Sequence, residues 1–445
     1  MKSRISFFDW ATAKKDLTRF APLWVLYTFI LFITVLPSVT VIGYLQHPLQ
    51  VLNTSIVVFS FCNSFYALLT ANLLFGDLFN SRLCNGLHAR PVTRTARFGS
   101  HVCAGLAFSF VPNLLMALLM MPSLGQFWFT ALLWFVVVCG QYLFFFSVAV
   151  FSAMCTGSRF AAVVIYGIIN YFSLILDWFI TLVFLPEMPG VSLDSLAFSE
   201  FSPVVRLLID ANYMHFSVSY KAMVSSHATF DGLGDSWPYL GILTVIAILL
   251  LAAALLLYRR RKLESAGDFI ATPWLKPIFL VLYSLCCGAF FSIFSLSRAV
   301  LLFPGLLIGF FTGKMLLART TRVFQKKNVL QAAIFAGVLL VMLWTAKADL
   351  FGIVRYVPEV EDVEQVSISN YYTANQSLST EAQKQLVHEL HTLAVEDPCD
   401  GSCGKKHTYL EIRYRLRSGR TVERYYYICD GSQADQLLDG LIKDN

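Results

Sequence analysis

"FWFTALLWFVVVCGQYLFFFSVAVFSAM", residues 127–154, runs for 28 residues without one charged side chain. A stretch of roughly 20 predominantly apolar residues is long enough to cross the hydrocarbon core of a membrane as a helix. In lipid it has to be helical, because every backbone amide needs a partner within the segment. Residues 127–154 are therefore predicted to form a membrane-spanning helix.

Further apolar blocks of similar length lie on both sides of this one. The chain of 445 residues is only 14% charged, whereas soluble domains are about a quarter charged. The first block has full span length and no small-residue cleavage site after it, so we expect it to remain as a span. The composition predicts a multi-pass membrane protein with nine spans, the other eight being 22–44, 51–75, 98–121, 160–185, 237–258, 274–295, 300–318 and 329–347.

The distribution of lysine and arginine predicts the orientation of the spans. Eighteen of these residues fall in the N-terminal segment and in alternate connections, and three fall in the intervening connections. Because basic loops stay on the cytoplasmic side, the N-terminus is predicted inside and, after nine spans, the C-terminus outside. The net charge of +6 combines a balance of +12 over residues 1–348 with one of −6 over residues 349–445, so the basic excess belongs to the membrane part of the chain. This basic excess suits anionic lipid and an acidic protein partner, not nucleic acid.

Two segments outside the spans have their own character. Residues 5–21 are predicted to form an amphipathic helix with one face in the membrane interface and one in water, the alternative being an ordinary juxtamembrane extension. The long outer connection 186–236 contains apolar pieces too short to span, which favour interfacial or re-entrant helices, or a loop. In the first segment the apolar set is Phe7, Trp10, Ala13, Leu17 and Phe20, and the polar set is Asp9, Thr12, Lys15, Asp16 and Arg19.

After the last span the composition becomes that of a water-soluble domain. Residues 363–372 alternate as a strand, and residues 408–428 alternate on both sides of a glycine-containing turn. Residues 379–395 and 432–443 have helical spacing of apolar side chains. The predicted fold class is therefore an all-α polytopic membrane protein with a small C-terminal extracytoplasmic α+β domain over 348–445.

No catalytic pattern is complete. "GFFTGKM" (309–315) resembles a phosphate-binding loop, but Ile308 replaces the first glycine and Met315 the magnesium-binding hydroxyl residue. "HELH" (388–391) has its histidines three apart, whereas a zinc protease helix needs them four apart. No "GxSxG" nucleophile turn occurs. We expect a non-enzymatic chain that binds no cofactor itself.

Three cysteines lie in the C-terminal module: Cys399, Cys403 and Cys429. An extracellular location permits a disulfide, and we expect one bridge among these three with an odd thiol remaining. The alternative adds His407 to make a Cys3His zinc site. Neither arrangement implies catalysis.

Asp177 lies inside the predicted span 160–185. An ionisable group in a membrane is a functional-site hypothesis, here a proton or ion relay in a gradient-driven carrier. The alternative is a carboxylate wetted near the surface or hydrogen-bonded to a neighbouring helix. Uncharged polar residues in the spans, namely Asn63, Asn72, Asn113, Gln141 and Asn170, are predicted to hydrogen-bond between helices.

A polar stretch, "DLFNSRLCNGLHARPVTRTARF" (77–98), connects the second and third spans on the predicted cytoplasmic side. Residues 77–89 can form a short helix, and Pro91 then forces a turn. Thr93 or Thr95 can cap the third span. A basic loop that only enforces topology is the alternative, although it does not explain the helix and the proline.

Three passages resemble the permease subunits of bacterial ABC-2-type ABC transporters, in a subgroup with extra C-terminal spans and an outer domain. They are "FDWATAKKDLTRFAPLWVLYTFI" (8–30), "LFNSRLCNGLHARPVTR" (78–94) and "RYVPEVEDVEQVSI" (355–368). Arg90 departs from the pattern, because the family usually has an apolar residue there. The matching residues are Asn80, Ser81, Arg82, Asn85, His88, Pro91, Val92, Thr93 and Arg94.

The resemblance implies four parts: an interface helix (1–21), a six-span core (22–258) with a coupling loop (76–97), three added spans (259–347) and the outer domain. It implies that the 77–91 helix docks on a separate ATPase subunit, which holds the ATP and magnesium. The chain would act in the bacterial cytoplasmic membrane as an exporter, as a homodimer or with a sister permease. Two alternatives stay open: a sensor or resistance module whose outer domain binds an envelope-active peptide or other ligand, and an ATP-independent carrier that uses Asp177.

Overall fold

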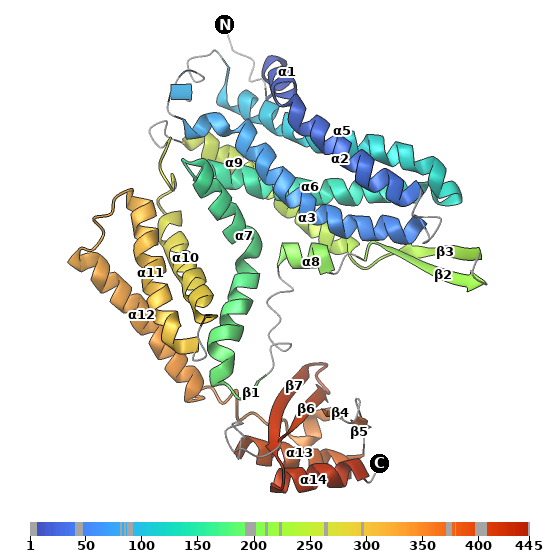
Figure 1. The fold of residues 1–445 in the computed structure, drawn as a ribbon, viewed down its shortest axis with the longest axis vertical. Helices are drawn as coiled ribbons and strands as arrows, with labels where there is room; N and C mark the ends of the chain where they lie inside the picture. The colour runs from blue at the N-terminus through green and yellow to red at the C-terminus, as the bar shows by residue number, and fades with distance from the viewer. Residues whose placement is uncertain are drawn as a thin grey trace. The chain divides into compact units, whose positions relative to one another are not determined.

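The protein is mostly helical in the computed structural model (Figure 1). Within the part that the structure describes, nine helices are long and apolar enough to cross a membrane, which confirms the predicted number of spans. The chain is therefore a multi-pass membrane protein. The described residues are 7–40, 48–80, 82–83, 86, 92–191, 202–209, 212–221, 225–261, 266–294, 298–370, 376–378, 380–396 and 407–443.

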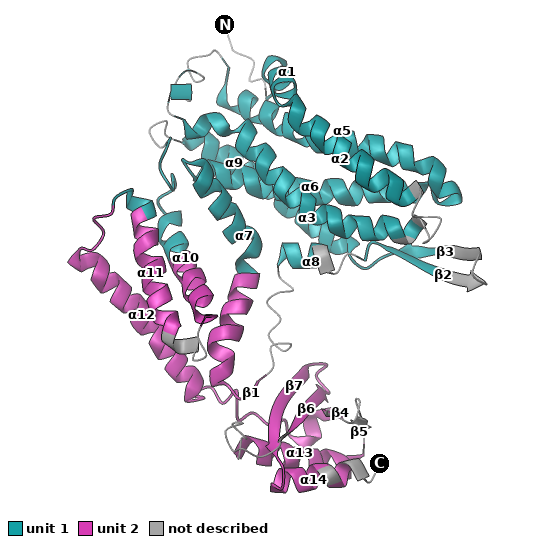
Figure 2. Ribbon diagram, in the orientation of Figure 1, with its two compact units in different colours: residues 1–173, 199–280, 316–320 teal, residues 174–198, 281–315, 321–445 magenta. Residues whose placement is uncertain are grey.

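The chain forms two compact units, coloured separately in Figure 2. The first contains residues 1–173, 199–280 and 316–320, and the second contains residues 174–198, 281–315 and 321–445. The boundary cuts through α7 (Arg159–Phe179), and it also leaves one end of α10 (Leu275–Ser292) and of α11 (Arg298–Ala318) in the first unit. The division into a six-span core and three added spans stays a prediction, because packing units need not coincide with functional ones.

The first unit is a bundle with α6 at its centre. Of the most apolar 18 residues of α6, 72% are buried, a larger share than in any other span of the described chain. Trp134, Tyr142 and Phe145 on this helix are fully buried. The stretch 127–154 is thus the innermost helix of the unit. Its spans are α2 (Ala21–Thr40), α3 (Pro48–Leu74), α5 (Arg94–Leu124), α6 (Phe129–Cys155), the first part of α7, and α9 (Trp237–Arg260), with η3 (Gly125–Phe127) between α5 and α6.

A buried polar cluster joins four of these spans. The Tyr27 hydroxyl on α2 donates to Asn63 Oδ1 on α3 over 3.0 Å, and it accepts from Asn113 Nδ2 on α5 over 3.2 Å. Asn63 Nδ2 also donates to the Val138 carbonyl on α6 over 3.3 Å. The predicted interhelical role is confirmed for Asn63 and Asn113. Asn72 instead donates to a carbonyl of its own helix.

The amphipathic N-terminal segment forms α1 (Trp10–Arg19), capped by the side chain of Asp9. Lys15 and Arg19 on its polar face are exposed as predicted, but Asp16 on the same face does not meet water. Asp16 is only 5% exposed, because its carboxylate lies 2.5 Å from His101 Nδ1 on α5. Ser100 Oγ accepts from the Asp9 amide over 2.7 Å and fixes the start of α1 to the same helix. Phe7 and Trp10 remain exposed.

The outer connection contains more than the expected helices. A short helix, α8 (Pro203–Ile209), holds the apolar piece "VVRLLI". It is followed by an antiparallel hairpin of β2 (Met214–Lys221) and β3 (Ser225–Leu233), so the prediction of helix or loop is wrong there. Strict alternation of apolar residues in β2, from Met214 to Tyr220, was the signal for a strand.

The spans of the second unit pack around a small apolar core. The α7 helix continues into a π-helical turn, η4 (Ile180–Phe184), and a final turn, η5 (Leu185–Glu187). The other spans are α10 (Leu275–Ser292), α11 (Arg298–Ala318) and α12 (Lys326–Lys347). Helices α10 and α11 approach closely, since a Cβ at Gly309 would lie 2.6 Å from Cys287 Cβ. The core comprises Phe179, Val183, Ala289, Leu302, Leu306 and Leu339.

The C-terminal module is a five-stranded antiparallel sheet with the order β1-β7-β6-β4-β5. Two helices pack on it, and the shared core includes Val387, Leu438 and Leu410. The four elements predicted from alternation and spacing are confirmed as β4, α13, the β6–β7 hairpin and α14. The edge strand β1 was not predicted. The elements are β1 (Gly190–Val191), η8 (Val360–Asp362), β4 (Val363–Asn370), β5 (Gln376–Leu378), α13 (Glu381–Glu396), β6 (His407–Leu416), β7 (Thr421–Cys429) and α14 (Gln433–Lys443).

Candidate functional site

The polar connection between α3 and α5 begins with two separate turns. Residues Gly76–Phe79 form a 3-10 turn, η2, and Asn80 then has an extended backbone. Asn80 Oδ1 accepts from the Arg82 amide over 3.0 Å, which is the hydrogen bond of a helix N-cap. Arg82, Leu83 and Gly86 are helical and exposed. A continuous helix from residue 77 is therefore wrong, because Asn80 interrupts it.

The remaining residues of the predicted coupling set divide between two groups. Ser81, Asn85, His88, Arg90 and Pro91 lie outside the described residues. Arg94 is described, together with Val92 and Thr93 before it. Thr93 caps α5 by accepting from the Ala96 amide over 3.2 Å, which confirms one of the two predicted caps.

Arg94 reaches from the first turn of α5 to the end of α9. Its Nη1 donates to the carbonyl of Arg259 over 3.1 Å and to that of Arg261 over 2.9 Å. The last carbonyls of a helix have no partner within the helix and carry a partial negative charge. The Arg94 guanidinium satisfies both needs, so the loop's return into the membrane is fastened to the sixth span.

Arg261 performs the same task for the other end of the loop. Its Nη1 donates to the carbonyls of Ala153 over 2.9 Å and Met154 over 3.2 Å, at the end of α6. Its Nη2 donates to the carbonyl of Leu78 in η2 over 3.2 Å. In the sequence, Arg261 belongs to a run of four basic residues after the sixth span, which predicts only the topology. Its contacts depend on segments more than a hundred residues away, which no local pattern reveals.

The chain after α9 also binds to this end of the bundle. The Ala271 amide donates to the Cys155 carbonyl over 2.9 Å, and the Gly267 amide donates to the Gly157 carbonyl over 2.7 Å. The Thr272 hydroxyl donates to Cys155 as well, over 2.9 Å. The ends of α3, α5, α6 and α9 are thus joined into one hydrogen-bonded base, from which Arg82 and Leu83 project. Among the described residues of this base there is no cluster of three or more metal-ligating side chains, and its hydrogen bonds connect both described ends of the loop to the spans.

The two intramembrane polar residues of the predicted site are Asn170 and Asp177. Asn170 is fully buried, and its Nδ2 donates to the Tyr166 carbonyl on its own helix over 3.0 Å. Asp177 is half-buried, and its backbone carbonyl accepts from the Thr181 hydroxyl over 2.7 Å beside the π-helical turn. The ion-relay role of Asp177 stays a prediction.

Of the predicted cysteine and histidine set, Cys399 and Cys403 lie outside the described residues. Cys429, at the end of β7, is disulfide-bonded. A bridged cysteine has no thiolate to give to zinc. No cluster of three or more metal-ligating side chains occurs among the residues whose side chains the structure describes, and the side chain of His407 lies outside them. The identity of the partner thiol stays a prediction.

The C-terminal domain holds a buried histidine that the "HELH" pattern did not explain. His391 is fully buried between two tyrosines, with Nδ1 3.0 Å from the Tyr414 hydroxyl and Nε2 3.0 Å from the Tyr426 hydroxyl. Burial, with a smaller contribution from the charge of Arg424, lowers the pKa of His391 to about 3. The imidazole is therefore neutral at physiological pH.

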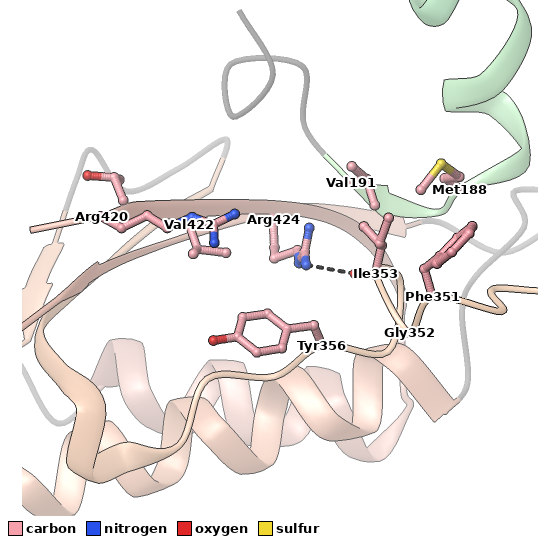
Figure 3. A pocket seen from close by; sticks show the side chains of 10 residues that line it. Met188, Val191, Phe351, Gly352, Ile353, Tyr356, Arg420, Val422 and Arg424 are labelled. Carbon is pink, nitrogen blue, oxygen red and sulfur yellow. Dashed lines mark hydrogen bonds between the residues drawn. The ribbon is translucent and has the colours of Figure 1, made fainter. Parts of the chain in front are cut away.

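The same domain has a cavity of about 410 Å³. Figure 3 shows its lining, in which two arginines and a tyrosine lie beside apolar side chains. No pattern in the sequence predicts this cavity. The lining residues are Met188, Val191, Phe351, Gly352, Ile353, Tyr356, Arg420, Thr421, Val422 and Arg424.

No protein-family model, curated protein or solved structure matches the chain. The function therefore has to be argued from the residues themselves.

Proposed function

We propose that this chain is the non-catalytic membrane subunit of an ATP-driven ABC transporter of the ABC-2 type, working as an exporter. A separate ATPase subunit, which holds ATP and magnesium, docks on the connection between the second and third spans. The observation that carries the proposal is the mounting of this connection: Arg94 and Arg261 fasten its two ends to α9 and α6, while Arg82 and Leu83 are left exposed.

Such a mounting suits energy coupling. ATP-bound ATPase subunits favour one arrangement of the spans, and hydrolysis releases it, so the free energy passes through a shift in populations. If the loop were flexible, a movement of the ATPase subunits would displace the loop alone and would not reach the spans. A loop end hydrogen-bonded to the carbonyl ends of neighbouring spans moves together with them.

The location follows from charge and redox state. The basic connections support a cytoplasmic N-terminus and coupling loop and a C-terminal domain outside a bacterial cell membrane. The disulfide at Cys429 supports this side for the domain, because disulfides persist in oxidising compartments. The exporter would contain two permease chains, either two copies of this one or this one with a sister permease.

The test is ATP hydrolysis by the reconstituted complex. We expect the chain to co-purify with an ATPase whose activity rises in its presence. Arg82→Ala and Arg94→Ala should reduce that rise at least fivefold, whereas Lys327→Ala, which removes an exposed charge from the first turn of α12, should not. Unchanged stimulation in both loop variants would refute the coupling assignment.

A sensor or resistance module is the second candidate, and the cavity of the C-terminal domain favours it. In that case the outer domain binds a ligand and the spans signal through the ATPase without moving cargo. Ligand binding by the protein in vesicles that show no transport would distinguish this role from export.

A further inference from the structure

The cavity in the second unit is formed by the two segments that leave the fifth and ninth spans. Met188 follows the last turn of η5 directly, and Gly352 comes five residues after the end of α12. The two exits are joined, since Lys347 Nζ lies 3.4 Å from Glu187 Oε2. Five residues reach at most about 18 Å. The cavity therefore lies near the level of lipid head groups.

The loop after α12 has a defined, hydrogen-bonded conformation. Asp349 has a left-handed backbone, with φ of 47°, and its two carboxylate oxygens accept from the amides of Val354 and Arg355 over 3.0 Å each. This ring of hydrogen bonds presents Phe351, Gly352 and Ile353 to the cavity, as Figure 3 shows. Both oxygens of the Asp349 carboxylate are therefore already hydrogen-bonded to backbone amides.

Arg424 on β7 supplies a buried positive charge to this cavity. The residue is 4% exposed, and its Nη2 donates to the Ile353 carbonyl over 2.8 Å. Its Nε has no hydrogen-bond partner, and none of the described carboxylates forms an ion pair with it. Burial lowers the pKa of Arg424. The nearby Tyr426, Tyr414 and Tyr356 and, more weakly, the Asp349 carboxylate act in the opposite direction, but Asp349 accepts from backbone amides and forms no ion pair with Arg424. A buried guanidinium without a direct ion pair is costly, so an anion in the cavity would stabilise it.

The other residues of the lining indicate which chemical groups the ligand carries. Arg420, at the start of the same strand, is exposed and adds a second positive charge at the rim. Met188, Val191 and Ile353 form an apolar side, and Phe351 is 79% exposed. Guanidinium groups recognise phosphate with paired hydrogen bonds. An apolar wall beside such a site fits the glycerol and upper acyl region of a lipid.

We propose that this cavity binds the phosphate head group of an anionic membrane lipid, with Arg424 and Arg420 as its ligands to the phosphate. The free phosphate ion shares the charge but not the apolar part. The nearness of the lining to two span exits favours the lipid. This site does not depend on coupling to an ATPase, and its test requires no ATP.

The test uses the full chain in detergent, to which short-chain phosphatidylglycerol, phosphatidylcholine or inorganic phosphate is added. Native mass spectrometry measures the lipid retained, and hydrogen exchange measures protection of residues 349–356 and 420–425. We expect phosphatidylglycerol to bind at least tenfold more tightly than phosphatidylcholine and to protect both segments. Inorganic phosphate at the same concentration should displace little of it.

Three variants place the binding at this cavity. Arg420→Ala and Arg424→Lys should each weaken phosphatidylglycerol binding about tenfold, the loss of one charge-assisted hydrogen bond. Arg417→Ala removes an equal charge from the same hairpin, at an exposed position outside the cavity lining, and should have no effect. Native-like exchange in β6 and β7 shows that a variant is folded. If the Arg424→Lys variant unfolds, the test depends on comparing Arg420→Ala with Arg417→Ala, both of which change exposed residues.

Three results would overturn the proposal. The first is equal binding of the two lipids, and the second is equal loss of binding in the Arg417 and Arg420 variants. The third is displacement by an equal concentration of inorganic phosphate, which would assign the site to a soluble ion.

Discussion

The guanidinium of Arg94, on the first turn of α5, lies 2.9 Å from the carbonyl oxygen of Arg261, just past the end of α9. This bond ties the start of the third span to the end of the sixth. Arg261 in turn holds the end of α6 and the turn that opens the connection between α3 and α5. Arg94 and Arg261 therefore fasten the two described ends of this connection to the helix bundle.

Arg94→Ala should loosen this base. The variant leaves the carbonyls of Arg259 and Arg261 without a donor, which we expect to cost about 1–3 kcal/mol. Amide exchange in the last turn of α9 should rise in the purified protein. Arg94→Lys should restore part of the protection, because lysine keeps the positive charge but lacks the forked guanidinium group. Identical exchange in Arg94→Ala and the unaltered chain would contradict the role of this contact.

Asp16→Ala should release α1 from the bundle. The substitution leaves His101 buried without its carboxylate partner, and removing one partner of a buried pair costs about 3 kcal/mol or more. Hydrogen exchange in residues 10–19 should then accelerate about a hundredfold. Lys15→Ala, at the exposed neighbouring position, is the matched control. Equal exchange in the two variants would show that α1 is held by other contacts.

The C-terminal domain should lose stability in acid through His391. Its folded pKa of about 3 lies below the unfolded value of about 6.5. The unfolded chain therefore takes up the proton first as pH falls through 6.5, and stability present above that pH is lost progressively down to pH 3. Between pH 7 and pH 5 we expect a loss of about 2 kcal/mol. Hydrogen exchange of β7 amides, corrected for intrinsic rates, measures it.

His391→Gln is the matched variant for this effect, since it keeps hydrogen-bonding capacity between Tyr414 and Tyr426 but cannot be protonated. Its domain should be less stable than the unaltered one at pH 7 and should change little between pH 7 and pH 5. A variant that keeps the full acid sensitivity would assign that sensitivity to other groups.

Reduction of the disulfide at Cys429 should destabilise the same domain. Closing a loop by a disulfide contributes about 2–4 kcal/mol, so Cys429→Ser or added reductant should lower the unfolding temperature of the domain. Cys286→Ser removes a free thiol and serves as the control. An unfolding temperature that does not respond to reductant would contradict a stabilising bridge.

The parts of the fold that follow local rules could be predicted from the sequence. Span number depends on the length of apolar blocks, and α13 and the β6–β7 hairpin depend on spacing within 30 residues. The contacts that build the base could not be predicted, because Arg94 and Arg261 meet carbonyls of remote segments. Asp16 has the pattern of a solvent-facing residue and is buried only because His101 lies opposite it.

The candidate sites divide in the same way. Asn80 and Thr93 cap the helices that follow them, a local role that residue type indicates. The cavity has no local signature, because Met188 and Arg424 are far apart in sequence and meet only through the two-residue strand β1. A strand of two residues is too short for any periodicity.

The most direct test of the coupling proposal is a photo-activated cross-linker placed at Leu83, which is 49% exposed beside Arg82. The same cross-linker at Phe324, 67% exposed in another basic connection, is the control. We expect the Leu83 position, and not the Phe324 position, to capture in cells a chain that binds and hydrolyses ATP. Absence of an ATP-hydrolysing partner at Leu83, or equal capture at both positions, would contradict the account.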